Sequence, residues 1–239
     1  MNSYNEIKKS LQEHNGTPEK VKILSSFFKT GKGEYGEGDQ FLGVTVPDQR
    51  KIAKQFFKKV TFDDIEKLLS SKWHEHRLTG LFLLVYRYEK ADEKEKKEIY
   101  TFYLEHLEAV NNWDLVDTTT PNIVGAYMCE HEEEKKKLKK WAKSQNLWER
   151  RIAVLATYAC IKKGEYNDTI KLAEMLLRDY HDLIHKAVGW MLREVGKKDE
   201  KILCNFLDKY AHEMPRTMLR YAIERLEEKM RKHYLSRKV

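Results

Sequence analysis

The strongest constraint on the fold is a helical segment that recurs at a nearly constant spacing. Each copy opens with a basic residue, carries a glycine or alanine two or three positions later, and has apolar residues at three- and four-residue spacing. Arg151, Lys186 and Arg220 are separated by about 35 positions, and Arg77 precedes Arg151 by about twice that distance. A helix pair that repeats at this length is typical of a HEAT-like or related α-solenoid.

The rest of the pattern is also helical, without the sustained alternation that a sheet requires. Trp73, Trp113 and Trp148 open three successive units of the repeat. We therefore predict an all-α fold: a single domain over residues 1–239, forming an α-α superhelix of about six HEAT-like helical pairs with a concave face. Helix-start signals support this prediction, namely Ser3 with Glu6, Thr61 with Asp64, and the cap-plus-proline pair Thr17-Pro18.

Composition narrows the class of protein without selecting a function. Lys and Arg outnumber Asp and Glu by 45 to 38, which permits a polyanionic partner but fits a generic basic surface equally well. Cys129, Cys160 and Cys204 are too few and too far apart for a disulfide framework or a CxxC metal motif. We expect a reducing, cytoplasmic setting. The longest apolar run, residues 81–86, is too short to span a bilayer, so we expect no membrane partner.

Three further segments have motif-like compositions, and we expect a structural role for each of them. Residues 31–43 hold five of the eleven glycines, but the acidic residues among them would repel phosphate, so we predict a structured loop between the second and third helices. The charged run over residues 132–137 is typical of a solvated helix face. The triplet His74-Glu75-His76 and the pair His181 and His185 suggest no third metal ligand, and we expect them on helix surfaces.

One segment combines an aromatic residue and an acid in a way that is typical of a catalytic site. Trp113 and Asp117 are four residues apart and share a helix face. Pro121 lacks the N–H that would bond the carbonyl of Asp117, which predicts a kink just below this acid. Irregular backbone beside an acid is typical of a functional site. The alternative is structural, with Trp113 in the core and Asp117 as a cap or salt-bridge partner.

Two later repeats offer an aromatic residue and a charge at matching positions. Trp148 and Arg151 are one turn apart, and Arg151 corresponds to Asp117 one repeat earlier. The alternative here is an inter-repeat salt bridge between Asp117 and Arg151. Trp190 lies in the segment that starts at Lys186 and is by itself a core candidate. Three such repeats in a row favour a shared cleft.

Four blocks together resemble the AlkD family of bacterial DNA alkylation-repair glycosylases. They are residues 41–47 (FLGVTVP), 113–117 (WDLVD), 148–153 (WERRIA) and 186–194 (KAVGWMLRE). The resemblance implies HEAT-like repeats whose concave basic face holds duplex DNA. It also implies hydrolysis of the N-glycosidic bond of cationic N3- and N7-alkylpurines, such as 3-methyladenine and 7-methylguanine, by a monomer without metal or cofactor.

The resemblance also implies roles for individual residues. Asp117 would be the catalytic carboxylate, Trp113 and Trp190 the aromatic residues of the cleft, and Arg151 a cation that grips the DNA backbone and orients the acid. Phe27 stands where the best-studied members have a cleft tyrosine, and Tyr35 is the alternative aromatic residue at that edge. The full set predicted to bind DNA is Arg151, Arg150, Lys186, Trp148, Phe27 and Tyr35.

Two other functions fit the same sequence. One is a catalytically weak or inactive relative that binds damaged or branched DNA structurally, which the replacement by Phe27 favours. The other is a protein-binding solenoid with no role in nucleic-acid binding, which the helical repeat alone also permits.

Overall fold

The computed structural model describes residues 2–237, and helices dominate it. Within that range the β pairing is limited to one isolated bridge between Gln40 and Trp73, so the all-α prediction is confirmed. The helices group into two compact units, Met1–Ile123 and Val124–Val239. The single domain over residues 1–239 stays a prediction beside this division, and each unit is described by itself.

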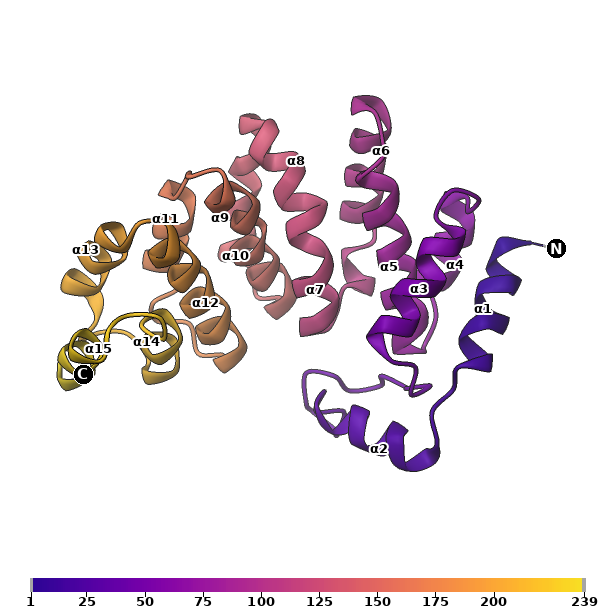
Figure 1. Ribbon diagram of the computed structural model, residues 1–239, viewed down its shortest axis with the longest axis horizontal. Coiled ribbons are helices and arrows are strands. Elements are labelled where there is room, and N and C mark those ends of the chain that lie inside the picture. The colour runs from indigo at the N-terminus through magenta and orange to yellow at the C-terminus, as the bar shows by residue number, and fades with distance from the viewer. Residues whose placement is uncertain (1, 238–239) are drawn as a thin grey trace. The chain divides into compact units, whose positions relative to one another are not determined.

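The first unit is organised around its fifth helix, α5. This helix packs against α3, α4, α6 and α7, while α1 contacts α3 and α4 (Figure 1). The helix α2 and the loop after it lie beyond the ends of the other helices of this unit. The helices are α1 (Ser3–Glu13), α2 (Pro18–Ser26), α3 (Val46–Phe56), α4 (Phe62–Leu69), α5 (His74–Tyr88), α6 (Glu93–Glu105) and α7 (Trp113–Thr119), with 3-10 turns at Leu107–Ala109 and Thr120–Asn122.

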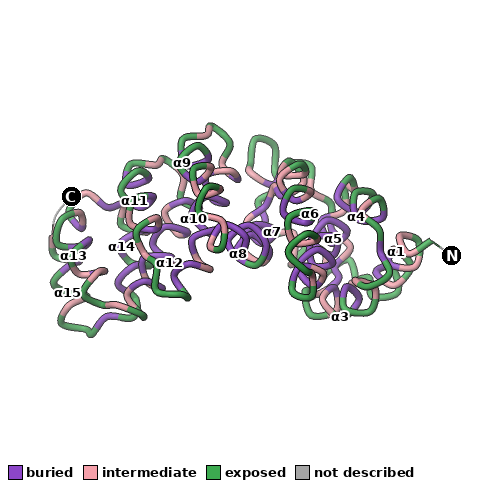
Figure 2. Tube along the Cα trace, turned by 90° about the horizontal axis from the view of Figure 1, so that it is seen from above, coloured by how far each residue is buried: buried purple, intermediate pink, exposed green. Residues whose placement is uncertain are grey.

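Burial explains the apolar run over residues 81–86. It lies in α5, where every residue except Arg87 is buried, and Figure 2 shows this burial along the helix. A helix surrounded by other helices needs an apolar surface on all sides. None of the helices within residues 2–237 combines the length and apolar character needed to cross a lipid bilayer.

The second unit has its helices in two layers. In one layer α10 packs against α8 and α12, and α12 packs against α14; in the other, α9 and α11 contact each other, and α13 packs on α12 (Figure 1). The helices are α8 (Val124–Glu130), α9 (Lys136–Ala142), α10 (Leu147–Lys162), α11 (Asn167–Met175), α12 (Asp182–Lys198), α13 (Glu200–Tyr210), α14 (Arg216–Ala222) and α15 (Glu228–Ser236), with a 3-10 turn at Glu132–Lys135.

The predicted helix starts are mostly confirmed. Thr17 caps α2 ahead of Pro18, and Thr61 and Asp64 form a complete capping box at α4. The Ser3 prediction is wrong by one residue, because the side chain of Asn2 accepts the hydrogen bond that caps α1. The tryptophans at 73, 113 and 148 each lie at or beside the first residue of a helix, α5, α7 and α10.

The two helices α8 and α10 approach each other closely at one glycine. A Cβ atom at Gly125 would lie 2.3 Å from the carbonyl oxygen of Ala156, a separation that real side chains do not tolerate. The absence of a side chain at Gly125 therefore sets the distance between α8 and α10.

This contact predicts that Gly125→Ala destabilises the protein by about 1–3 kcal/mol, since the backbone of α10 must shift to accept a methyl group. The measurement is the free energy of unfolding from urea denaturation. Gly31→Ala is the control, because a Cβ there meets only the flexible side chain of Glu34. Equal stability of Gly125→Ala and the wild type would contradict the close approach.

Candidate active site

The helix α7 carries the first two predicted site residues. Asn112 caps it by accepting a hydrogen bond from the backbone N–H of Trp113 at 2.8 Å. Trp113 and Asp117 follow one turn apart, and both are half-buried. Pro121 has a stronger effect than the predicted kink: α7 ends at Thr119 and a 3-10 turn replaces it. Asp117 therefore lies in the last turn of a short helix.

A buried phenol lies within the electrostatic reach of Asp117. The hydroxyl group of Tyr103, on α6, hydrogen-bonds the hydroxyl groups of Thr119 and Thr120, both at 2.9 Å. Burial raises the pKa of Tyr103 to about 12, and the charge of Asp117 acts in the same direction. Tyr103 is therefore neutral at physiological pH and ties the end of α7 to α6.

The position of α7 depends on a buried histidine that the sequence analysis placed on a surface. His74, 2% exposed at the start of α5, has Nε2 2.8 Å from a carboxylate oxygen of Asp114 and Nδ1 3.1 Å from one of Asp39. The same oxygen of Asp39 accepts a hydrogen bond from the side chain of Asn112 at 2.9 Å, and Arg77 forms an ion pair with the other oxygen. This network joins the glycine-rich loop, α5 and α7.

The charge of His74 follows from its neighbours. Burial alone lowers the pKa of His74, but the carboxylates of Asp114 and Asp39 outweigh burial and raise it to about 9. Burial also opposes ionisation of Asp39, yet His74 and Arg77 hold the pKa of that carboxyl group below its ordinary value. An imidazolium between two carboxylates is therefore the stable form at neutral pH.

The other two residues of the triplet are buried as well, so the prediction of surface histidines is wrong here. Glu75 accepts hydrogen bonds from the backbone N–H groups of Leu42 and Gly43 at 2.9 and 2.8 Å. His76 lies 2.9 Å from the hydroxyl oxygen of Ser71, and burial lowers its pKa to about 4. His74 and Glu75 therefore anchor the loop, whereas His76 binds the segment just before α5. The partners of His74 and Glu75 are far away in sequence, which is why the pattern gave no signal.

Aromatic rings fill the space between the loop and α7. Trp113 stacks on Phe28 with ring centroids 5.2 Å apart, and Phe28 stacks on Phe41 at 4.9 Å. The predicted residue Phe27 is 62% exposed, and its carbonyl oxygen accepts a hydrogen bond from the hydroxyl group of Tyr35 at 3.2 Å. The structure thus joins Phe27 to Tyr35 and places Phe28, which the sequence analysis missed, against Trp113.

The two adjacent arginines of α10 are both buried, each 4% exposed. Arg150 pairs with Asp179 at 2.7 Å and donates to the carbonyl oxygens of Ser144 and Gln145 at 3.0 Å. These contacts favour a structural role for Arg150 over the predicted contact with DNA. Arg151 donates to the carbonyl oxygen of Leu183, which links α10 to the first turn of α12.

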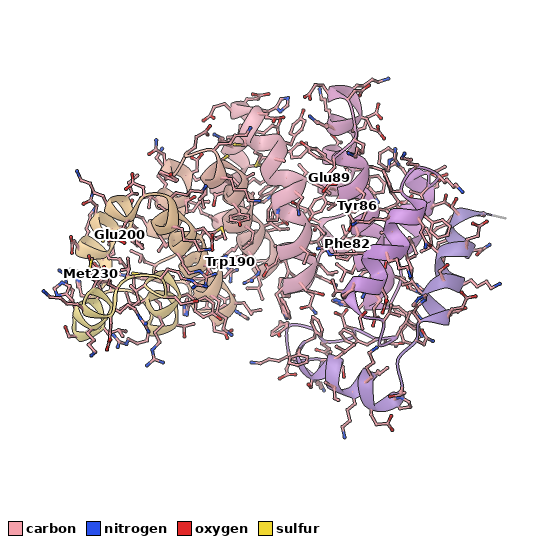
Figure 3. All side chains as sticks on the ribbon, viewed as in Figure 1. Phe82, Tyr86, Glu89, Trp190, Glu200 and Met230 are labelled. Atoms are coloured by element: carbon pink, nitrogen blue, oxygen red, sulfur yellow. The ribbon has the colours of Figure 1, made fainter. Side chains whose placement is uncertain are left out.

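The remaining predicted residues lie on α10 and α12. Trp148 is 9% exposed, whereas Lys186 is partly exposed and pairs with Asp182 at 2.9 Å. Trp190 is half-buried on α12, and its indole N–H donates to Glu194 at 3.2 Å (Figure 3). The predicted site thus draws on α2, the glycine-rich loop and α7 in the first unit and on α10 and α12 in the second.

Comparison with known proteins identifies a family. The sequence model of the DNA alkylation repair enzymes matches residues 7–226. No curated protein matches the chain.

Solved structures share the fold at low sequence identity. A predicted DNA alkylation repair enzyme from Enterococcus faecalis is 18% identical, with a TM-score of 0.70 over 90% of this chain and 98% of that one. AlkD2 from Streptococcus mutans is also 18% identical, with a TM-score of 0.57 over 87% of this chain and 98% of that one. A second Streptococcus mutans protein, smu.31, is 18% identical and gives a TM-score of 0.55 over 77% of this chain and 92% of that one.

The charge of His74 predicts a stability that depends on pH. A pKa raised from 6.5 to about 9 contributes about 3 kcal/mol, which is fully present below pH 6.5 and is lost as the pH rises through about 9. The measurement is the free energy of unfolding from urea titrations at pH 6 and above pH 9. His74→Gln should remove most of this decline, whereas His14→Gln, at an exposed position, should keep it. An identical decline in the wild type and His74→Gln would contradict the charged imidazole.

Proposed function

Because the chain belongs to the family of DNA alkylation repair enzymes, we propose that it is a DNA glycosylase for cationic N3- and N7-alkylpurines in duplex DNA. The observation that carries the proposal is the arrangement on α7. A carboxylate, Asp117, and an indole, Trp113, lie one turn apart on a short helix that buried hydrogen bonds hold in position. The family supports DNA as the substrate, and these residues support the chemistry.

The proposed reaction needs few groups because the substrate is already activated. An alkylated purine that carries a positive charge leaves with the electron pair of its bond to C1′ and becomes neutral, so no general acid has to protonate it. Positive charge then develops on the deoxyribose, as in other glycosyl cleavages. A carboxylate beside the sugar stabilises this charge and orients a water molecule, which adds to C1′ and loses a proton. Asp117 would perform this role without metal or cofactor.

The other predicted residues would surround the reacting sugar. The indole faces of Trp113 and Trp190 would attract its electron-poor C–H edges and exclude water. Arg151 would hold the DNA backbone. Arg150 is committed to Asp179, so in this proposal it supports the start of α10 instead of contacting a phosphate.

The proposed DNA contacts include residues of both units. Lys186 is a partly exposed cation of α12, and Phe27 offers an exposed ring at the end of α2, where its carbonyl oxygen accepts a hydrogen bond from the hydroxyl group of Tyr35. Trp148 would support this surface from the first turn of α10. In this proposal the protein holds the duplex through these residues and acts as a cytoplasmic monomer.

The first test replaces the acid without changing its shape. Asp117→Asn should lower the rate of 7-methylguanine release from methylated duplex DNA by about a hundredfold or more, because an amide cannot stabilise the developing cation. DNA affinity should stay close to that of the wild type. Asp63→Asn, at an exposed carboxylate of the same unit, should have no effect. Full activity of Asp117→Asn would rule out this mechanism, and a wild type that binds DNA without releasing any base would favour the inactive relative.

The second test separates a DNA-binding protein from a protein-binding solenoid. If about four phosphates are contacted, affinity for duplex DNA should fall by on the order of a hundredfold between 50 and 200 mM salt. Lys186→Ala should reduce the slope of log affinity against log salt by about 1, and Lys94→Ala, at an exposed lysine of α6, should leave it unchanged. Fluorescence anisotropy of a labelled duplex gives these values. Lack of binding even at low salt would favour the protein-binding alternative.

A further inference from the structure

Three potential metal ligands meet in the second unit. The thiols of Cys129 on α8 and Cys160 on α10 and a carboxylate oxygen of Glu165 all lie within 4.8 Å of one another. Cys160 is 5% exposed, Cys129 is half-buried, and Glu165 is exposed in the turn after α10. The sequence analysis predicted no metal, because the two cysteines are 31 residues apart and form no CxxC motif.

Helix packing explains why the two thiols meet. Gly125 and Cys129 are four residues apart on α8, and Ala156 and Cys160 are four residues apart on α10, so each pair shares a face of its helix. The backbones touch at Gly125 and Ala156, where an added Cβ would lie 2.3 Å from a carbonyl oxygen. One turn further along, the close contact leaves the two cysteines facing each other.

A glycine turn supplies the third ligand. Gly164 has a φ of +87°, the left-handed conformation that ends many helices. Its N–H bonds the carbonyl oxygen of Ile161 at 3.1 Å, and the N–H of Glu165 bonds that of Cys160 at 3.0 Å. The chain therefore folds back over the last turn of α10. This reversal places the side chain of Glu165 beside the thiol of Cys160.

A lysine with a largely covered side chain occupies the edge of this cluster, although the charged run over residues 132–137 is exposed or partly exposed, as the prediction of a solvated face requires. The side chain of Lys135 is 9% exposed, and its ammonium group contacts Glu132 at 2.6 Å, Glu165 at 3.1 Å and Asp168 at 3.7 Å. Burial, followed by the neighbouring Cys129, raises the pKa of the Cys160 thiol. Three carboxylates thus surround one cation at the edge of the cluster, and Lys135 supplies that charge.

We propose that Cys129, Cys160 and Glu165 bind one thiophilic divalent ion, Zn²⁺ being the best fit, with water as the fourth ligand. Zn²⁺ binds thiolate, imidazole and carboxylate ligands in tetrahedral sites, whereas Mg²⁺ and Ca²⁺ require oxygen ligands. Zn–S bonds of about 2.3 Å at tetrahedral angles place two sulfur atoms roughly 3.8 Å apart. Ligands already within 4.8 Å reach that geometry by small side-chain movements.

The exposure of the cluster and its position between helices are both consistent with a metal site. Glu165 is exposed and Cys129 is half-buried, so an ion can reach the cluster from solvent. Binding replaces the two thiol protons, which are released to solvent, by the ion. The ion would join α8, α10 and the turn between α10 and α11, so its role is to stabilise the second unit. The proposal is independent of the proposed glycosylase activity.

The test uses the full-length chain, kept reduced and treated with a chelator, then titrated with Co²⁺ as a spectroscopic probe. One Co²⁺ per chain should produce an intense thiolate-to-cobalt charge-transfer band, and Zn²⁺ should displace it. Cys129→Ser and Cys160→Ser should each weaken binding by about a hundredfold or more, and Glu165→Gln by about tenfold. Cys204→Ser is the matched control, a free cysteine of the same unit outside the cluster, and should bind normally.

Lys135→Met should strengthen Co²⁺ binding, whereas substitution of the three ligands should weaken it. Removing the ammonium group leaves Glu165 without its resident cation, so Co²⁺ should bind about tenfold more tightly. Circular dichroism of each metal-free variant verifies folding, and the less buried Cys129 and Glu165 keep the test decisive if Cys160→Ser does not fold.

Three results would overturn the proposal. The first is absence of the charge-transfer band in the reduced wild type, and the second is equal Co²⁺ affinity of Cys129→Ser, Cys204→Ser and the wild type. The third is a reduced protein that binds no metal but forms a Cys129–Cys160 disulfide in air, which would make the pair a redox couple.

Discussion

The first unit depends on one charged ring in its interior. The imidazolium of His74 lies between Asp39 and Asp114 and is almost fully buried, where an unpaired charge would be very unfavourable. Pairing with two carboxylates from different segments satisfies both ring nitrogens. Because Asp39 lies in the glycine-rich loop and Asp114 lies in α7, the same contacts fix the loop and the helix together. The positions of Trp113 and Asp117 follow from this network.

The features that the sequence predicted well are local ones. The capping box at Thr61, the tryptophan that opens α7 and the four-residue spacing of Trp113 and Asp117 all act within one or two turns. The network around His74 joins residues 35 and 40 positions apart, and no spacing rule connects them. The pairing of Phe28 with Trp113 has the same origin, because neighbouring Phe27 has equal propensity and only the packed loop distinguishes the two rings.

The sequence pattern predicts the surroundings of long cationic side chains poorly. Arg150 is buried in the second unit and the side chain of Lys135 is largely covered, and both pair with carboxylates from distant turns. Long side chains can bury their aliphatic part and still reach a partner with the charged end. Each such pair contains a carboxylate as well as a cation, so pairing leaves the excess of Lys and Arg unchanged and only lowers the number of cations that a polyanion can contact.

The two carboxylates of α7 illustrate how environment assigns different tasks to the same residue type. Asp114 is 6% exposed and bonds both the imidazole of His74 and the backbone N–H of Leu115, so its charge is committed to the fold. Asp117, three residues later, is half-buried near the end of the helix. Asp114 compensates the charge of a buried imidazolium. If this carboxylate moved toward positive charge developing on a sugar, the imidazolium would lose its partner. Asp114 is therefore unsuited to the proposed cleavage, which our proposal assigns to Asp117, and it holds α7 in position instead.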